Sequence, residues 1–343
     1  MSAEMKTDVT SKKPREQAGS ICFFVPYFGK LPAWFNLYLK SCEFNPSVNW
    51  IFYTNCRAAY APANTKFVTV ALDDFNKLAS QKLGFPVKIK NPYKLCDFKP
   101  AYGIIFEDYL KNYAFWGHTD VDIIYGDIKK FITKDILENY EIISSSARGP
   151  IGHFCLYKNN NRINNLFKNS DEYKNIFSDK RYLGFDEFGW PNNDQLAQKL
   201  RLASITSIVK NMAGAGRIKI YLKETCRNGF LLEKKFVLYF NNGKLTDTKN
   251  DTEYMYFHFF KLKNFYGSNK ETQGKTRNRF YITNYEIFFD KETHPVERTL
   301  KRCAQLMTKS FIIIDANIGK FGLYLKKRLP AIYSKIKMHL SGK

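Results

Sequence analysis

Two carboxylates separated by one residue, Asp120 and Asp122, directly follow an apolar and aromatic run, FWGHT, at residues 115–119. Carboxylates at this spacing reach one pocket, and hard divalent cations such as Mg²⁺ and Mn²⁺ prefer oxygen ligands. The alternative is a turn, because an Asp side chain accepts hydrogen bonds from nearby backbone N–H groups. We expect a divalent metal held against a diphosphate.

The charge of the chain points to an anionic partner. Its 343 residues carry a formal net charge of +22, which attracts nucleic acid, an anionic membrane or a phosphorylated substrate. Hydrophobic residues make up 44% and aromatic residues 16% of the chain, enough for a packed core. Seven scattered cysteines without a CxxC pair favour reduced thiols over a disulfide framework or a zinc site.

Apolar runs and their order predict an α/β domain. Strands are expected at residues 20–28, 49–55, 65–72, 113–119 and 141–146, with helices at 33–45 and 91–110, the latter bent or restarted at Pro100. Strand, helix and strand in this order indicate a mostly parallel sheet flanked by helices. Ligands bind beyond the carboxyl ends of such strands, which places Pro26, Tyr27 and Asn55 near a crevice. The Asn-Gly pair at 242–243 predicts a hairpin.

Three runs in this order resemble bacterial glycosyltransferases of polysaccharide synthesis with a GT-A fold: residues 21–55, YKLCDFKPAYGIIFEDYL at 93–110, and FWGHTDVDIIYGDI at 115–128. The resemblance is to a family associated with capsule, O-antigen and lipopolysaccharide synthesis, and covers roughly residues 20–265. It implies a Rossmann-like sheet, a nucleotide-sugar donor, and a divalent cation, Mn²⁺ or Mg²⁺, bridging Asp120 and Asp122 to the donor diphosphate. It also implies sugar transfer to a hydroxyl of a glycan or glycolipid acceptor, with nucleoside diphosphate leaving.

Within that resemblance, residues upstream of the carboxylate pair are expected to bind the donor. Lys94, Asp97 and Lys99 are candidates, with Lys94 and Asp97 on one helical face; the alternative is a solvated face with an internal ion pair. Tyr27 could stack on the base, or be an aromatic at the rim. Asn55 could bond the base or ribose.

A late His258-x-x-Lys261 pattern resembles a retaining GT-A branch. The resemblance implies His258 as a third metal ligand and Lys261 on the diphosphate; the alternative is a histidine packed on a strand. His153 is expected to contact the acceptor.

Asp186 and Glu187, in a loop before a predicted helix, are candidates for the base that takes the acceptor proton, with Asp186 preferred. Their alternative role is to cap that helix.

The chain is expected to divide into a disordered tail at 1–19, a GT-A catalytic domain at 20–294, and a basic amphipathic helical segment at 295–343. No run has the apolar length of a membrane span, and residues 1–20 lack the apolar core of a signal peptide. The last segment mixes Lys and Arg with large apolar residues, which predicts attachment to the anionic cytoplasmic face of the inner membrane. For the function of the whole protein, the alternatives to a glycosyltransferase are a nucleic-acid-binding protein with a basic, aromatic-rich surface and a non-catalytic membrane scaffold. We expect no nucleic acid as a partner.

Overall fold

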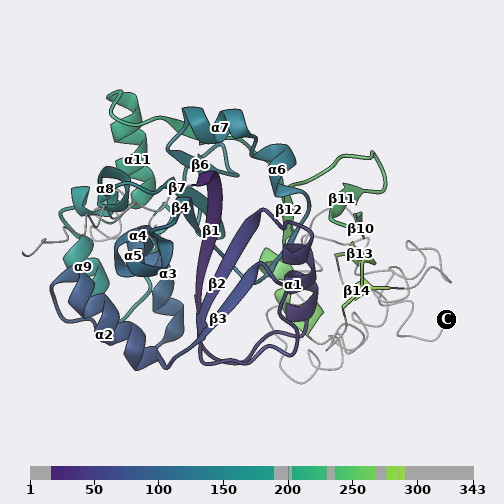
Figure 1. The fold of residues 1–343 in the computed structure, drawn as a ribbon, viewed down its shortest axis with the longest axis horizontal. Helices are drawn as coiled ribbons and strands as arrows, with labels where there is room; N and C mark the ends of the chain where they lie inside the picture. The colour runs from purple at the N-terminus through teal and green to yellow at the C-terminus, as the bar shows by residue number, and fades with distance from the viewer. Residues whose placement is uncertain are drawn as a thin grey trace, which may run out of the picture. The chain divides into compact units, whose positions relative to one another are not determined.

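The computed structural model describes residues 17–188, 200, 203–229, 236–267, 276–284 and 286–289. A seven-stranded sheet forms its centre, in the order β3–β2–β1–β4–β7–β6–β8 (Figure 1). Within this sheet only β7 runs against its neighbours. The strands are β1 (Gln17–Tyr27), β2 (Val48–Thr54), β3 (Thr65–Thr69), β4 (Tyr113–Thr119), β6 (Ile142–Ser144), β7 (Phe154–Lys158) and β8 (Ile220–Leu222). The predicted class, an α/β fold with a mostly parallel sheet flanked by helices, is confirmed.

The first strand shows why its sequence is a continuous apolar run. Phe23 and Val25 lie in the core on one face of the sheet, and Cys22 and Phe24 lie in the core on the other. A strand covered on both faces has no side that must be polar. Strand β1 begins at Gln17, inside the segment expected to be a disordered tail.

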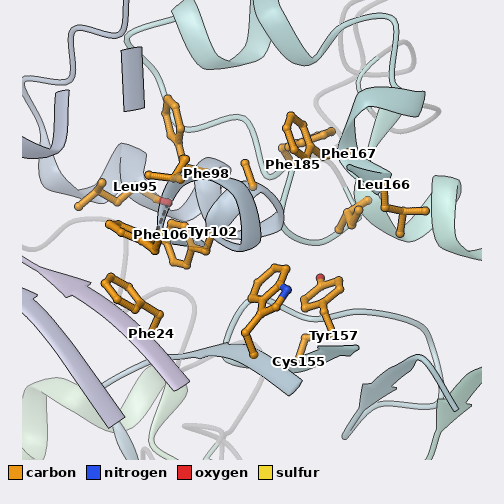
Figure 2. Packing of buried hydrophobic residues seen from close by; sticks show 14 of the residues in the cluster. Phe24, Leu95, Phe98, Tyr102, Phe106, Cys155, Tyr157, Leu166, Phe167 and Phe185 are labelled. Carbon is orange, nitrogen blue, oxygen red and sulfur yellow. Dashed lines mark hydrogen bonds between the residues drawn. The ribbon is translucent and has the colours of Figure 1, made fainter. Parts of the chain in front are cut away.

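One face of the sheet is covered by helices and aromatic side chains (Figure 2). Phe24 stacks on Phe106 with ring centroids 3.8 Å apart, and Trp116 stacks on Tyr157 at 4.4 Å. The elements of this layer are α2 (Leu72–Leu83), α3 (Leu95–Phe98), α4 (Tyr102–Ile105), α5 (Glu107–Leu110), α8 (Asn161–Asn164), η3 (Leu166–Asn169), α9 (Tyr173–Ser178) and α11 (Ile205–Gly214).

The segment predicted as one helix at 91–110 is instead a series of short turns. It runs through η1 (Pro92–Lys94), α3, η2 (Lys99–Ala101), α4 and α5. Pro100 has no N–H to donate to the preceding turn, which disfavours a continuous helix, and the chain forms a 3₁₀ turn there. The series turns Lys94, Asp97 and Lys99 into the protein, where all three are buried.

The other face packs against α1 (Phe35–Glu43), α6 (Ile128–Phe131) and α7 (Lys134–Asn139). A three-stranded sheet joins this layer, in the order β5 (Ile123–Tyr125), β12 (Tyr256–His258) and β9 (Cys226–Asn228). Strand β5 follows the carboxylate pair, so this small sheet brings residues near 258 to the end of β4.

A four-stranded antiparallel sheet has the order β11 (Lys244–Asp247), β10 (Val237–Asn241), β13 (Arg279–Thr283) and β14 (Ile287–Phe288). The predicted hairpin is confirmed: Asn242 and Gly243 join β10 to β11 with φ of 48° and 87°. Positive φ at both central residues is the reason that Asn-Gly favours such turns. The remaining described elements are η4 (Phe260–Leu262) and α12 (Lys263–Gly267).

In the part of the chain that the structure describes, no helix combines the length and apolar character needed to cross a membrane. The predicted basic amphipathic segment at 295–343 lies outside the described residues.

Candidate active site

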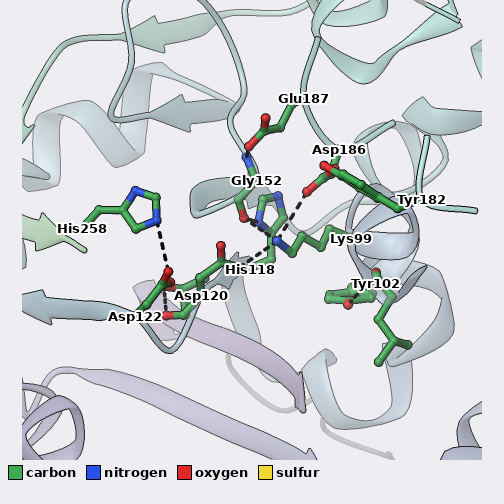
Figure 3. A network of polar contacts seen from close by, with 12 residues as sticks. Lys99, Tyr102, His118, Asp120, Asp122, Gly152, Tyr182, Asp186, Glu187 and His258 are labelled. Atoms are coloured by element: carbon green, nitrogen blue, oxygen red, sulfur yellow. Dashed lines mark hydrogen bonds and ion pairs between the residues drawn. The ribbon is translucent and has the colours of Figure 1, made fainter. Parts of the chain in front are cut away.

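The carboxylate pair and His258 meet at the carboxyl end of β4 (Figure 3). In β12, His258 lies opposite Ile123 of β5, the residue that follows Asp122. One ligand atom from each of Asp120, Asp122 and His258 lies within 4.8 Å of the others. Two carboxylates and an imidazole at this spacing are a donor set for a divalent cation.

The surroundings of these three side chains fit such an ion. The Nδ1 atom of His258 is 3.0 Å from Oδ1 of Asn228, which leaves Nε2 facing Asp122 at 3.5 Å. Metal-bound histidines usually have their second nitrogen held by such an oxygen. Asp122 is buried, and its Oδ2 faces both His258 Nε2, at 3.5 Å, and the Lys263 ammonium, at 2.8 Å. Burial raises the pKa of Asp122, but His258 and Lys263 outweigh it and hold that pKa well below its usual range, so the carboxyl stays ionised.

The lysine beside this cluster is Lys263 and not Lys261. The Lys263 ammonium lies 2.8 Å from Asp122 Oδ2. Asp122 outweighs the effect of burial and raises the pKa of Lys263. Lys261 is exposed, with its ammonium over the Phe260 ring at 5.6 Å. Because the chain turns at η4, the side chains of Lys261 and Lys263 reach different partners. Sequence reasoning missed Lys263, and the only signal was a second lysine two residues further on.

Lys99 lies between Asp120 of the candidate metal cluster and a second carboxylate pair. Its Nζ atom is 2.8 Å from Asp120 Oδ1, 2.8 Å from the Gly152 carbonyl oxygen and 3.3 Å from Asp186 Oδ2. Burial lowers the pKa of Lys99, but Asp120 and Asp186 outweigh it and raise that pKa well above its usual value. Three acceptors account for the three donors of an ammonium group, so Lys99 bridges carboxylates.

Asp186 and Glu187 differ in their access to solvent. Asp186 is 1% exposed, and its Oδ1 accepts a hydrogen bond of 2.8 Å from the Tyr182 hydroxyl. Burial raises the pKa of Asp186 to about 8, with Lys99 acting in the opposite direction. Glu187 is half-buried, and its Oε1 accepts from the Gly152 N–H at 3.1 Å. The helix that the two residues were expected to precede falls on residues outside the described chain.

Lys94 and Asp97 form an ion pair of 2.7 Å in the interior. Lys94 also donates to the carbonyls of Ile176 and Arg181, and Asp97 accepts from two backbone N–H groups, those of Leu183 and Phe185. The two residues share a face as expected and form the internal ion pair that the alternative named, but this face is buried and not solvated. Through these bonds the pair holds residues 181–185, the segment that leads to Asp186, in place. Their expected role in binding the donor stays a prediction.

A cavity of about 390 Å³ lies beside the cluster. Its lining combines the end of β1 with the site carboxylates and includes Pro26, Tyr27, Trp34, Tyr93, Lys99, Asp120, Asp122 and Lys263. The Asn55 side chain accepts from the Gly29 N–H at 3.0 Å and so fixes the loop after β1. A larger hollow, about 890 Å³, includes residues at the amino ends of β2 and β3 and none of these carboxylates.

His153, expected at the acceptor, stacks on His258 of the candidate metal cluster. The rings of His153 and His258 are 4.0 Å apart at 19°. Burial lowers the pKa of His153 and of His118 well below the usual histidine value, so both rings are neutral. His118 Nδ1 lies 3.0 Å from the Gly152 carbonyl, which Lys99 also contacts.

The chain belongs to a protein family of unknown function (DUF6625), whose sequence profile matches residues 23–292. Among solved structures it is similar to galactosyltransferase LgtC crystallised with donor and acceptor sugar analogs, at 11% identity and a TM-score of 0.35. It is also similar to the structure of an active-site mutant of LgtC, at 11% identity and a TM-score of 0.36. In both cases the similarity covers 70% of this chain and 86% of the other. No curated protein matches.

Proposed function

We propose that this protein is a metal-dependent glycosyltransferase of the GT-A type, which moves a sugar from a nucleotide-sugar donor to a hydroxyl of a glycan acceptor. The observation that carries the proposal is the Asp120–Asp122–His258 cluster, placed where the middle strand of a mostly parallel sheet ends. Ligands in such sheets bind beyond the carboxyl ends of the strands.

The charges and shape of the cavity favour a nucleoside diphosphate group. A divalent cation on the three ligands would bridge them to phosphate oxygens and offset the charge that develops on the leaving diphosphate. Lys263 adds a flexible cation at the same place, since half of its side chain is exposed. Tyr27 and Tyr93 give the cavity flat aromatic sides that suit a base or a sugar ring.

The transfer step would use the half-buried carboxylate. The acceptor oxygen forms a bond to the anomeric carbon, and the bond from that carbon to the diphosphate oxygen breaks, with its electron pair leaving on the diphosphate. Glu187 receives the acceptor proton, because it is reachable from solvent while Asp186 is 1% exposed and bonded to Tyr182 and Lys99. Glu187 is thus the general base. Asp186 and Lys99 keep their ion pair in the buried part of the site.

Tryptophan fluorescence tests the donor and metal together. Trp34 lines the cavity and its Nε1 donates to the Val121 carbonyl, between the two carboxylates of the cluster. Uridine or guanosine diphosphate should quench the fluorescence only with Mn²⁺ or Mg²⁺ present, and Trp34→Phe should remove that change. Slow donor hydrolysis, measured over a panel of nucleotide sugars, then identifies the sugar. Equal nucleotide binding in EDTA, or hydrolysis of no donor, would overturn the proposal.

The surface offers little support for nucleic-acid binding. Base stacking needs exposed aromatic rings, and the exposed large hydrophobic side chains of the described chain are Tyr93 and Phe260. Salt-sensitive binding of random oligonucleotides without nucleotide-dependent quenching would favour that alternative.

We also propose that the acceptor is lipid-linked and that residues 295–343 hold the enzyme on the cytoplasmic face of the membrane. The support is the composition of that segment, in which Lys and Arg are mixed with large apolar residues. Each cation close to an anionic surface contributes about 1 kcal/mol. The whole chain should sediment with anionic vesicles, less so in high salt, and hardly at all with neutral vesicles. Equal sedimentation with both kinds of vesicle, or with neither, would contradict anchoring.

A further inference from the structure

Gly152 contacts the second carboxylate pair and Lys99 through both of its backbone groups (Figure 3). Its N–H donates to Glu187 Oε1 at 3.1 Å, and its carbonyl oxygen accepts from Lys99 Nζ at 2.8 Å. His118 Nδ1 lies 3.0 Å from the same carbonyl. A single residue in the chain that enters β7 therefore bonds three side chains that come from distant segments.

The residue must also be small. A Cβ atom at position 152 would overlap Asp186 Oδ2 and lie 2.8 Å from Glu187 Oε1. The need is one of space, since Gly152 is not among the glycines with positive φ, whereas Gly149 has a φ of +136°. Asp186 and Glu187 approach the backbone as closely as they do because this position carries no side chain.

We propose that Gly152 is a positioning residue for Asp186 and Glu187. Its backbone fixes Glu187 and Lys99, and its missing side chain admits Asp186 to within 3.3 Å of the Lys99 ammonium. Lys99 also contacts Asp120, so Asp186 and Glu187 are set at a fixed distance from Asp120. This inference rests on the proposed glycosyl transfer and adds to it the residue that sets the geometry between the two ends of the site.

Gly152→Ala separates positioning from binding. We expect kcat for donor hydrolysis and transfer to fall at least about 100-fold, since a small displacement of reacting groups costs that much. The donor KM and the affinity for Mn²⁺ with nucleoside diphosphate should stay within about threefold, because the atoms nearest to the added methyl belong to Asp186 and Glu187 and not to the Asp120–Asp122–His258 cluster. A wild-type kcat in Gly152→Ala would overturn the inference.

Gly103→Ala is the matched control. Its Cβ would lie 2.6 Å from the Trp116 ring and 2.8 Å from Asn164 Oδ1, so it is crowded to a similar degree within the hydrophobic core. This variant should lower Tm while leaving kcat per folded molecule unchanged. A loss of kcat as large as that of Gly152→Ala would show that any crowded glycine in this fold has the effect, and would overturn a specific role for Gly152.

A thermal double-mutant cycle gives a readout that does not require turnover. Asp186→Ala removes the carboxylate that the new methyl would meet, so Gly152→Ala with Asp186→Ala should lose less Tm than the sum of the single changes. Gly103→Ala with Asp186→Ala should be additive. Additive losses in the first pair, or coupling without any loss of kcat, would overturn positioning. If the wild type neither binds nucleotide nor hydrolyses a donor, the proposed function fails, while the Tm cycle still decides whether Gly152 sets the place of Asp186.

Discussion

Lys94 and Lys99 are five residues apart in one interrupted helical segment, and both are buried with carboxylates. The Lys94 ammonium has Asp97 and two backbone carbonyls as partners and is absent from the cavity lining. The Lys99 ammonium is shared by two carboxylates from different parts of the chain, and the residue lines the cavity beside the metal cluster.

The difference shows that two buried lysines of one segment can have different surroundings, because Lys99 borders the cavity and Lys94 does not. The Lys94–Asp97 pair lies away from the cavity, and breaking such a buried pair costs folding free energy. A cluster with more carboxylates than cations, open to a cavity, can exchange partners with a ligand. Changes at the two places should therefore have different consequences.

The largest effect is expected at Asp122. Asp122→Asn removes a metal ligand at nearly constant shape, and we expect transfer to fall on the order of 1000-fold, since a bound metal supplies several kcal/mol of transition-state stabilisation. Calorimetric titration with Mn²⁺ and nucleoside diphosphate should show weakened metal binding. Asp127→Asn, at the exposed cap of α6, is the control, because an amide caps as well as a carboxylate. Wild-type activity of Asp122→Asn would remove the metal from the proposal.

Lys94→Met should act on stability alone. It leaves Asp97 buried without its counter-charge, and such changes cost about 3–5 kcal/mol in the free energy of unfolding. Urea denaturation measures the loss, and nucleotide affinity of the folded protein should be unchanged. Lys82→Met, which removes an ion pair with exposed Glu107 and Asp108, should cost less than about 1 kcal/mol. If Lys94→Met instead weakened nucleotide binding at full stability, the contrast with Lys99 would disappear.

The raised pKa of Asp186 makes stability depend on pH. The groups around Asp186 are Lys99, Glu187, Asp97 and Tyr182, and burial raises its pKa from 3.8 to about 8 in the folded protein. The folded state therefore holds a proton that the unfolded state has lost, and this group lowers the free energy of unfolding as pH rises from about 4 to about 8.

Asp186→Asn should remove that part of the slope, which urea titrations at several pH values measure. Asp171→Asn, an exposed carboxylate, should leave the slope unchanged. An identical slope in wild type and Asp186→Asn would show that Asp186 titrates normally.

The smallest effect is expected at Lys263, whose ammonium occupies a side of Asp122 that a cation would use. Lys263→Ala should strengthen Mn²⁺ binding without nucleotide, because it removes a positive charge beside a metal ligand. We expect a change of only about 3- to 10-fold, since solvent screens a partly exposed ion pair. The same change should weaken binding of nucleoside diphosphate. Lys261→Ala, two residues away and exposed, should do neither. If Lys261→Ala had the larger effect, the original choice of Lys261 for the diphosphate would be supported.

Much of the site could be predicted from local sequence. Asp120 and Asp122 follow a recognisable strand, and neighbouring residues stay neighbours in any fold. His258 was a candidate only through its pattern with Lys261, and the structure brings His258 to Asp122 but directs Lys261 elsewhere. The turn η4, between His258 and α12, decides which lysine reaches the carboxylate, and a short turn of this kind has no clear periodic signature.

The sequence by itself determined the α/β class, the order of the first strands, the Asn-Gly hairpin and the carboxylate pair at a strand end. These depend on side-chain alternation and on contacts a few residues apart, which the sequence displays directly. Only the tertiary structure decided that Lys99 bridges Asp120 and Asp186, and that Gly152 must lack a side chain. Those properties arise between groups tens of residues apart, whose distances, and so their electrostatic energies, exist only once the chain has folded.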